Sequence, residues 1–542
     1  MTPQGASFDI HMAKFLKCCA LMAAVAAALS SCSWRVERDP DVLALRLTAD
    51  PPTLNPVTAT DVTAGQVGRY VFESLLERDN ESLELVPSLA ERWEASNDKL
   101  SYTFWLRKGV RWHDGAPFDA DDVIFTFERI RDPKVDAARL RNYFRDVKSI
   151  EKVGEDAVRF VYARPYFKAL EMCGTAAIIP KHLFADGDDF NSHPLGRAPV
   201  GTGPYRFAEW KSGQRIVLAR NEGYWGEKPA ISGIVFNIIP DQMVAFELLK
   251  KGALDLSTMR AIQWVRQTES SSFASRFDKY RYYLPNYFYV GWNMRSPLFS
   301  DRRVRIAMTM LVNRRAILEK VLLGQGEVVA SNFYRFGRIY DESIEPYPFD
   351  PQRARELLEE AGWSDTDGDG VRDKDGVEFR FTMLSSSSDS TSKSLGLFMR
   401  EELRKVGIVM EVQQFEWATM LDLLSRRDFD AASLGWSTTI EEDPYQVWHS
   451  SQAEEGSNFV GFSDARADRL IEEARQEFDP AVREKLYREF QGILHREEPY
   501  TFLFTVPSLV AVAKRFEGVK AYRLGVDTLE WKVGPWPALM QW

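Results

Sequence analysis

The sequence predicts an α/β protein with more than one domain. Strand signals and helix signals are mixed along the chain, a pattern that fits neither a β-sandwich nor a helical bundle. At about 100–200 residues per domain, 542 residues are enough for two to four domains with a large buried core. A hydrophobic content of 45% and a charged content of 27% are typical of a soluble globular chain.

Five stretches of alternating or β-branched apolar residues predict strands. The first ends at Asp50-Pro51-Pro52, where two prolines cannot continue a strand ladder. In the second, Tyr102 and Phe104 alternate with polar neighbours before Lys108-Gly109 closes the run. The five strands are expected at residues 42–47, 101–106, 215–220, 379–384 and 409–415.

Helices are expected where a capping residue precedes apolar residues at helical spacing. Asp119 has the side chain of an N-cap for a helix over residues 120–130, with Asp121 and Asp122 in the first turn, where the helix dipole favours acids. Beyond about residue 300 helical patterns dominate. Expected there are one helix over 303–323 that stops at Gly324, one from Asp350-Pro351 to Gly362, and one starting at Asp479-Pro480.

Charge and motif content exclude several functional classes. The chain has 69 basic and 79 acidic residues, so a general electrostatic attraction to nucleic acid is not expected. The sequence contains no His-Glu-x-x-His, Gly-x-Ser-x-Gly or Walker motif. Gly201-Thr202-Gly203-Pro204 is a lone glycine pair whose proline removes an amide donor, and we expect a tight turn there. We therefore expect no enzyme activity.

The first residues predict export and lipid attachment. Lys14 and Lys17 precede an uncharged run over 18–29 that is too short to span a bilayer. The ending Leu29-Ser30-Ser31-Cys32 resembles a bacterial lipobox, so we expect residues 1–31 to be a signal peptide and 32–41 a tether lipidated at Cys32. The alternative is an ordinary signal peptide with an incidental cysteine. Beyond this region only Cys173 remains, and we expect it to be a buried thiol.

One acidic loop has the pattern of a metal site. Asp365, Asp367, Asp369 and Asp373 place oxygens at alternate positions, and Gly370 stands at the sixth position, as at the start of a calcium loop. The twelfth position is a glycine instead of a bidentate glutamate, and basic neighbours offset the local charge. A structural calcium and a solvated turn therefore both stay open, and no other cofactor is expected.

Seven blocks occur together in a fixed order at residues 85–94, 102–110, 113–123, 201–205, 221–225, 301–307 and 361–363. Asn221-Glu222-Gly223-Tyr224-Trp225 and Ala361-Gly362-Trp363 are two of them. In order and coverage they resemble the family 5 extracellular solute-binding proteins, the receptor subunits of oligopeptide and dipeptide ABC importers. Each block alone is weak, and the resemblance rests on their combination from about residue 43 to 520.

This resemblance implies a two-lobe periplasmic-binding-protein fold with an extra inserted subdomain and a hinged cleft that closes over ligand. Lobe I is then discontinuous and contains residues 42–72, 200–290 and 505–542. The inserted subdomain of lobe I covers 73–199, and lobe II covers 291–504.

The resemblance also places the ligand site. Trp417, Gly435, Trp436 and Ser437 resemble the positions at which an aromatic wall and a strand-like backbone edge pair with an extended peptide. Three more positions, Tyr287, Tyr289 and Asn293, match the stretch that crosses between the lobes, where the family places a tyrosine against the ligand. Plain core packing is the alternative for each aromatic side chain. Asp443 and Tyr445 lie in a following segment that keeps the family pattern.

One position departs from the family pattern. Peptide-binding members have an aspartate three residues after the tryptophan of this motif, where it pairs with the α-ammonium group of the peptide. Thr439 stands there in this sequence, and a neutral hydroxyl cannot supply a charge-assisted bond. Glu441, Glu442 and Asp443 follow closely, and each is either a substitute for that acid or part of a solvated acidic turn.

The function expected from the resemblance is an extracytoplasmic, lipid-anchored receptor that captures peptides and delivers them to an ABC permease. The partners are then a peptide or another small solute, the permease and membrane lipid through Cys32, for a monomeric protein with no nucleic-acid partner. The alternatives are the same role for an oligosaccharide, a metal chelate or an opine, a peptide-sensing signalling lipoprotein, and a secreted hydrolase.

Overall fold

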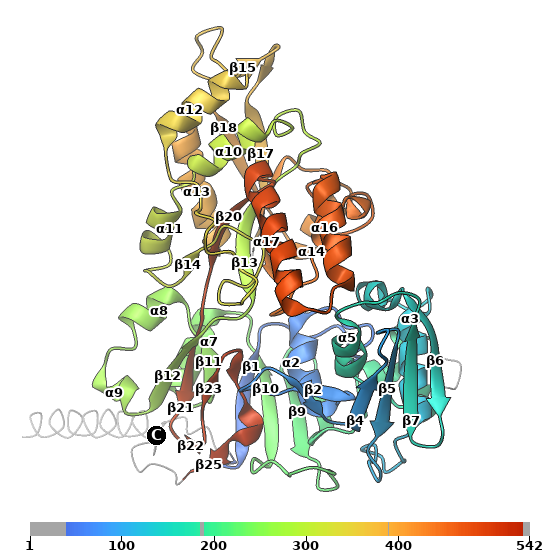
Figure 1. The fold of residues 1–542 in the computed structure, drawn as a ribbon. Helices are drawn as coiled ribbons and strands as arrows, with labels where there is room; N and C mark the ends of the chain where they lie inside the picture. The colour runs from blue at the N-terminus through green and yellow to red at the C-terminus, as the bar shows by residue number, and fades with distance from the viewer. Residues whose placement is uncertain (1–38, 185–188, 388–389, 535–542) are drawn as a thin grey trace, which may run out of the picture.

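Two lobes, each built around its own sheets, make up the protein in the computed structural model, which describes residues 39–184, 189–387 and 390–534 (Figure 1). The fold is α/β, with mixed sheets covered by helices. The inserted subdomain forms one side of the lower lobe in Figure 1 and lies under the helices of the upper lobe.

Lobe I contains two sheets. The first has the order β1-β10-β9-β8, in which β1 pairs in parallel with β10. The second has the order β11-β21-β12, and α2 and α7 are helices of the same lobe. The bounds are β1 (Val42–Leu47), α2 (Val62–Val71), β8 (Tyr205–Lys211), β9 (Arg215–Arg220), β10 (Gly233–Ile238), α7 (Gln242–Lys250), β11 (Leu256–Thr258), α8 (Ala261–Arg266), α9 (Ser271–Ala274), β12 (Phe277–Tyr282) and β21 (Ser508–Ala513).

The inserted subdomain is an antiparallel sheet with the order β4-β5-β7-β6. Its buried side chains and those of lobe I form one continuous hydrophobic core, so the subdomain is fixed to lobe I. Cys173 is buried in this core, as the sequence predicted. The bounds are β4 (Ala90–Ala95), β5 (Ser101–Leu106), α3 (Ala120–Arg131), α4 (Ala138–Arg141), β6 (Val147–Val153), β7 (Ala157–Tyr162), α5 (Ala169–Thr175) and α6 (Lys181–Phe184).

Lobe II is built on a six-stranded sheet with the order β14-β20-β13-β19-β17-β18. Its two faces contribute to different cores, one packed by α10, α12 and α13 and the other by α16 and α17. The bounds are β13 (Asn286–Trp292), α10 (Arg302–Met310), α11 (Arg314–Lys320), β14 (Glu327–Val328), α12 (Pro351–Glu360), β17 (Arg380–Ser386), α13 (Ser390–Arg404), β18 (Val409–Phe415), α14 (Trp417–Ser425), β19 (Ala431–Ser437), α15 (Tyr445–Trp448), α16 (Ala465–Gln476), α17 (Pro480–Glu497) and β20 (Tyr500–Thr505).

Short two-stranded pairings complete the described chain. They are β2 (Leu76–Arg78) with β3 (Leu85–Pro87), β15 (Asp373–Lys374) with β16 (Val377–Glu378), β22 (Phe516–Glu517) with β25 (Lys532–Val533), and β23 (Ala521–Tyr522) with β24 (Gly525–Val526).

The described part of the chain crosses between the lobes twice. Residues 283–285 join β12 of lobe I to β13 of lobe II, and residues 506–507 join β20 back to β21. The two lobe boundaries expected from the sequence lie after residues 290 and 504, close to these crossings. The first crossing precedes 290 because β13 pairs along its length with β19, deep in the sheet of lobe II.

The predicted strands and most of the predicted helices are confirmed. Asp119 caps α3 in a capping box completed by the side chain of Asp122. The expectation of one helix over 303–323 is wrong, because the chain forms α10 and α11 with a break between them. Asn313 causes the second start, since its side chain accepts a hydrogen bond from the amide of Ala316 (2.9 Å) and so caps α11.

Candidate ligand-binding cleft

Strand β19 has one open edge. It pairs with β13 along all seven of its residues, whereas β17 pairs only with Ala431 and Ala432. Among the described residues no strand pairs with positions 433–437 on the side of β17. A strand edge of this kind presents backbone donors and acceptors to an added extended chain. Gly435, Trp436 and Ser437, three predicted site residues, lie on this edge.

The aromatic residues of the predicted site differ in exposure. Trp436 is half-buried, and its ring lies parallel to that of Phe459 with the centroids 6.3 Å apart. Trp417 is 53% exposed at the first position of α14. At Gly435 an added Cβ would lie only 3.1 Å from the ring of Phe288, so any other residue there would require this ring to shift.

The residues predicted on the crossing strand are buried. Tyr287 and Tyr289 are 3% and 1% exposed, and Tyr289 stacks on Tyr500 with the ring centroids 3.8 Å apart. Burial raises the pKa of both tyrosines well above its ordinary value. The side chain of Asn293 donates to the backbone oxygen of Phe429 (2.7 Å). These contacts stabilise the sheet, and a ligand contact for the three residues stays a prediction.

A cavity of about 910 Å³ lies between the lobes. Its volume is within the range of small-molecule sites. Its apolar wall combines Met259 and Ile262 of lobe I, Val321 and Leu322 of lobe II, and Phe504 and Val506 near the crossing. Phe288, which lines the cavity, is the β13 partner of Gly435. The cation in this lining is Arg260, which is exposed and was not predicted.

Thr439 follows the open edge and meets an ammonium group of the protein itself. The Nζ of Lys168 donates to the Oγ1 of Thr439 (2.8 Å) and to the backbone oxygen of Glu441 (2.9 Å). Lys168 is only 3% exposed and comes from the inserted subdomain, immediately before α5. The hydroxyl of Thr439 in turn donates to the same oxygen of Glu441 (2.9 Å). Thr439, where the resemblance implies an aspartate, therefore lies beside an ammonium group of the protein itself.

Two of the three acids after Thr439 are engaged with arginines. Arg483 donates to Glu441 (Nε to Oε1, 2.9 Å). Asp443, which is 6% exposed, accepts a hydrogen bond from the hydroxyl of Tyr166 (2.9 Å) and forms an ion pair with Arg475 (3.1 Å). Arg475 also lies over the rings of Tyr166 and Tyr445, at 4.8 and 4.4 Å from the centroids.

Glu442, the third acid, lacks such an arginine. One of its oxygens accepts a hydrogen bond from the backbone amide of Thr439 (3.0 Å). Burial raises the pKa of Glu442 to about 7, against the opposing effect of the Lys168 ammonium. Glu442 therefore changes its charge near neutral pH.

These contacts join the lobes. Tyr166, Phe167 and Lys168 belong to the subdomain that is fixed to lobe I, and their partners belong to lobe II. The amide of Phe167 donates to the backbone oxygen of Arg475 (2.9 Å), and Arg483 lies over the Phe167 ring (4.4 Å). We call Tyr166-Phe167-Lys168 the latch segment. No local sequence signal predicts it, since its partners are more than 250 residues away.

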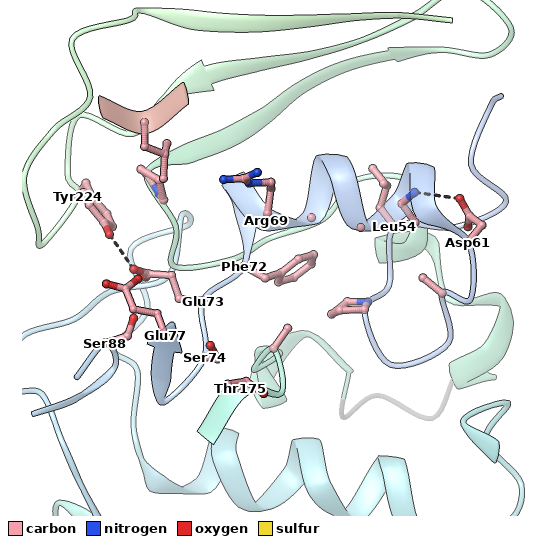
Figure 2. A pocket seen from close by; sticks show the side chains of 18 of the residues that line it. Leu54, Asp61, Arg69, Phe72, Glu73, Ser74, Glu77, Ser88, Thr175 and Tyr224 are labelled. Carbon is pink, nitrogen blue, oxygen red and sulfur yellow. Dashed lines mark hydrogen bonds between the residues drawn. The ribbon is translucent and has the colours of Figure 1, made fainter. Parts of the chain in front are cut away.

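A second pocket, of about 420 Å³, lies beside α2 in lobe I (Figure 2). Glu73 points into it and accepts hydrogen bonds from the hydroxyl of Tyr224 (2.7 Å) and the indole of Trp225 (3.0 Å). Burial raises the pKa of Glu73. The donors come from one of the sequence blocks, Asn221 to Trp225, so this block holds α2 to the first sheet.

The acidic loop brings three of its four aspartates together. Oxygens of Asp365, Asp367 and Asp373 lie within 4.8 Å of one another. The carboxylate of Asp365 accepts hydrogen bonds from the amides of Gly368 (2.8 Å) and Gly370 (3.0 Å). The carboxylate of Asp369 instead accepts a hydrogen bond from the amide of Val371 (2.7 Å). Calcium binding at this loop stays a prediction.

Comparison with known proteins agrees with this geometry. The family model described as bacterial extracellular solute-binding proteins, family 5 middle, matches residues 84–458. The oligopeptide-binding protein AppA of Bacillus subtilis is 31% identical over 485 residues, which cover 87% of each chain.

Two solved structures share the fold closely. The structure of AppA from Bacillus subtilis in complex with a nonapeptide has a TM-score of 0.82 at 29% identity and covers 91% of this chain and 99% of that one. The structure of NikZ from Campylobacter jejuni in complex with Ni(L-His) has a TM-score of 0.81 at 27% identity and covers 91% and 100%.

The described part of the chain holds no helix with the length and apolar character needed to cross a membrane, and Cys32 lies outside the described residues. The extent of the family match, together with the two lobes and the cleft between them, identifies the chain as a member of the family 5 bacterial extracellular solute-binding proteins.

Proposed function

We propose that this protein is an extracytoplasmic receptor that captures peptides in the cleft between its lobes and delivers them to an ABC permease. The observation that carries the proposal is the open edge of β19, whose neighbouring strand β13 supplies Phe288 to the interlobe cavity. Backbone pairing at such an edge binds extended peptides without reading their side chains, and a roomy cavity accepts side chains of different shape. The AppA complex with a nonapeptide supports a peptide as ligand.

Further parts of the proposal rest on the family and on the sequence. Solute-binding receptors perform no chemistry on their ligands, so we propose no enzyme activity for this chain. Lipid attachment at Cys32 would hold the monomeric receptor near its permease at the outer face of the cytoplasmic membrane or in the periplasm. Radiolabelled fatty acid incorporated by the wild-type protein and not by Cys32→Ala tests the anchor.

Titration calorimetry with peptide pools tests the ligand class. We expect binding by pools of synthetic peptides, and loss of binding when alternate backbone amides are N-methylated, because methylation removes the donors that a strand edge needs. Pools that bind equally well with and without N-methylation would contradict pairing at the edge. Pools that never bind would contradict a peptide ligand.

Trp436→Ala tests the aromatic wall. We expect it to weaken peptide binding by more than about 1 kcal/mol, because a large aromatic contact is lost. Trp105→Ala is the matched control, since Trp105 lies on β5 of the inserted subdomain under the guanidinium of Arg92 (3.5 Å), away from the cleft. Equal affinities for both variants would remove Trp436 from the site.

A non-peptide solute is the second candidate. It is favoured by one observation, the Lys168 ammonium at Thr439, where a peptide with a free amino terminus would bring a second positive charge. The NikZ complex with Ni(L-His) shows that a protein of this fold at 27% identity binds such a small solute. Identification of the molecule that copurifies with the protein separates the two candidates.

A further inference from the structure

Lys168 is a buried cation that is hydrogen-bonded and ion-paired within the protein. Burial of an ammonium group is unfavourable unless acceptors surround it. Here Nζ reaches Thr439 Oγ1 (2.8 Å), Glu441 O (2.9 Å) and Glu171 Oε2 (3.4 Å). Two of these contacts are hydrogen bonds and the third, with Glu171, is an ion pair, so the buried charge is compensated within the protein. The acceptors that a ligand ammonium would need at this place are already occupied.

The Lys168 ammonium lies where we expect one end of a ligand bound along the open edge. Thr439 lies two residues after β19 ends, so an extended ligand paired with positions 433–437 has one terminus directed toward Thr439. Lys168 reaches the same place from the opposite lobe. The latch segment therefore determines the charge that one end of the ligand meets.

The other charged groups around Lys168 are paired or partly neutral. From lobe II, Glu441 pairs with Arg483 and Asp443 with Arg475, and Glu442 faces the Thr439 amide. From its own subdomain, Glu171 also pairs with Arg78 (3.0 Å). Each described acid near Thr439 therefore has a cation of the protein beside it, which in the case of Glu442 is Lys168 itself. A like charge brought beside a buried ammonium is repelled.

We propose that Lys168 is a built-in ammonium that selects ligands with a neutral or acidic group at the Thr439 end and rejects ligands with a free amine there. The favoured ligand class is an amino-blocked peptide or an extended organic acid. This inference rests on the proposed function, because it requires the ligand to lie along the edge of β19.

Two peptide pools of identical sequences, one with free amino termini and one N-acetylated, test the selection. The protein is extracted from membranes in detergent, and dissociation constants are measured by competition against a fluorescent N-acetylated peptide. For the wild-type protein we expect at least about tenfold tighter binding of the acetylated pool. Equal binding, or tighter binding of the free-amine pool, would overturn the inference while leaving the peptide receptor intact.

Variants separate charge from structure. Lys168→Met keeps an apolar stem and removes the charge, so the preference for acetylated peptides should disappear, whereas Lys168→Arg should keep it. Lys148→Met, at an exposed lysine of the same subdomain, is the control and should bind both pools as the wild type does. A preference that persists in Lys168→Met would overturn the inference.

A double variant guards against loss of the latch contacts. Thr439→Asp alone should change little, because Lys168 would pair with the new carboxylate. Combined with Lys168→Met, it should turn the preference toward free amines. If neither pool binds the wild-type protein, the proposal of peptide capture fails. The inference about Lys168 is then tested by the charge of the molecule that copurifies with the protein. A neutral or acidic molecule then supports the inference, and an organic cation overturns it.

Discussion

Removing the Tyr166 hydroxyl should open the cleft without unfolding the protein. Tyr166→Phe deletes the hydrogen bond to Asp443 (2.9 Å), which joins the inserted subdomain to lobe II, and leaves the ion pair of Asp443 with Arg475 in place. A hydrogen bond to a charged group contributes about 1.5–3 kcal/mol. The ratio of open to closed molecules should therefore rise by about 13- to 160-fold.

Single-molecule energy transfer measures this ratio. Dyes at Glu155→Cys in the inserted subdomain and Glu411→Cys in lobe II report on the lobes, because both positions are exposed and Cys173 is buried. Tyr205→Phe is the matched control, since that buried hydroxyl donates to Ile231 O (2.9 Å) within lobe I. An unchanged distribution in Tyr166→Phe, or the same change in Tyr205→Phe, would refute a closing role for the latch segment.

Three further predictions concern stability and metal binding. Asp255→Asn should lower the free energy of unfolding of lobe I by about 3–5 kcal/mol in urea, because it removes the carboxylate of a buried ion pair with Arg515, whereas loss of the exposed Lys520 pair should cost less than about 1 kcal/mol. Burial raises the pKa of Glu498 to about 8 from an ordinary value near 4.5, so the folded protein holds a proton that the unfolded chain releases in this window. Stability should therefore fall as pH rises from about 4.5 to 8, and the fall should be smaller in Glu498→Gln; an identical pH profile for both proteins would contradict this origin. If the acidic loop binds calcium, calorimetry should show heat that Asp365→Asn abolishes, and the absence of heat in the wild-type protein would leave a solvated turn.

The elements were predictable wherever the signal is local. Asp119 and Pro351 start helices because capping and a fixed φ act within one turn, and both helices occur as expected. The break at Asn313 was missed because hydrophobic periodicity continues across it, although an asparagine cap was present in the sequence. An N-cap residue within a run of helical periodicity was therefore the sequence signal that could have predicted the break.

The site was predictable only as far as the family resemblance reaches. Trp436 and its neighbours lie on an open edge, and their pairing with a ligand there stays a prediction. Lys168 and Tyr166 carried no signal, because they meet Thr439 and Asp443 only after the inserted subdomain and lobe II come together. The replacement of an acid by Thr439 was visible in the sequence, and its structural counterpart, the ammonium of Lys168, was not.

The central claim, capture of extended peptides, is tested most directly by native mass spectrometry of residues 33–542 purified without denaturation, followed by fragmentation of whatever copurifies. We predict a ladder of short peptides of mixed sequence, because backbone pairing at the edge of β19 does not read side chains. A single non-peptide mass would contradict the claim and assign the cleft to a different class of solute.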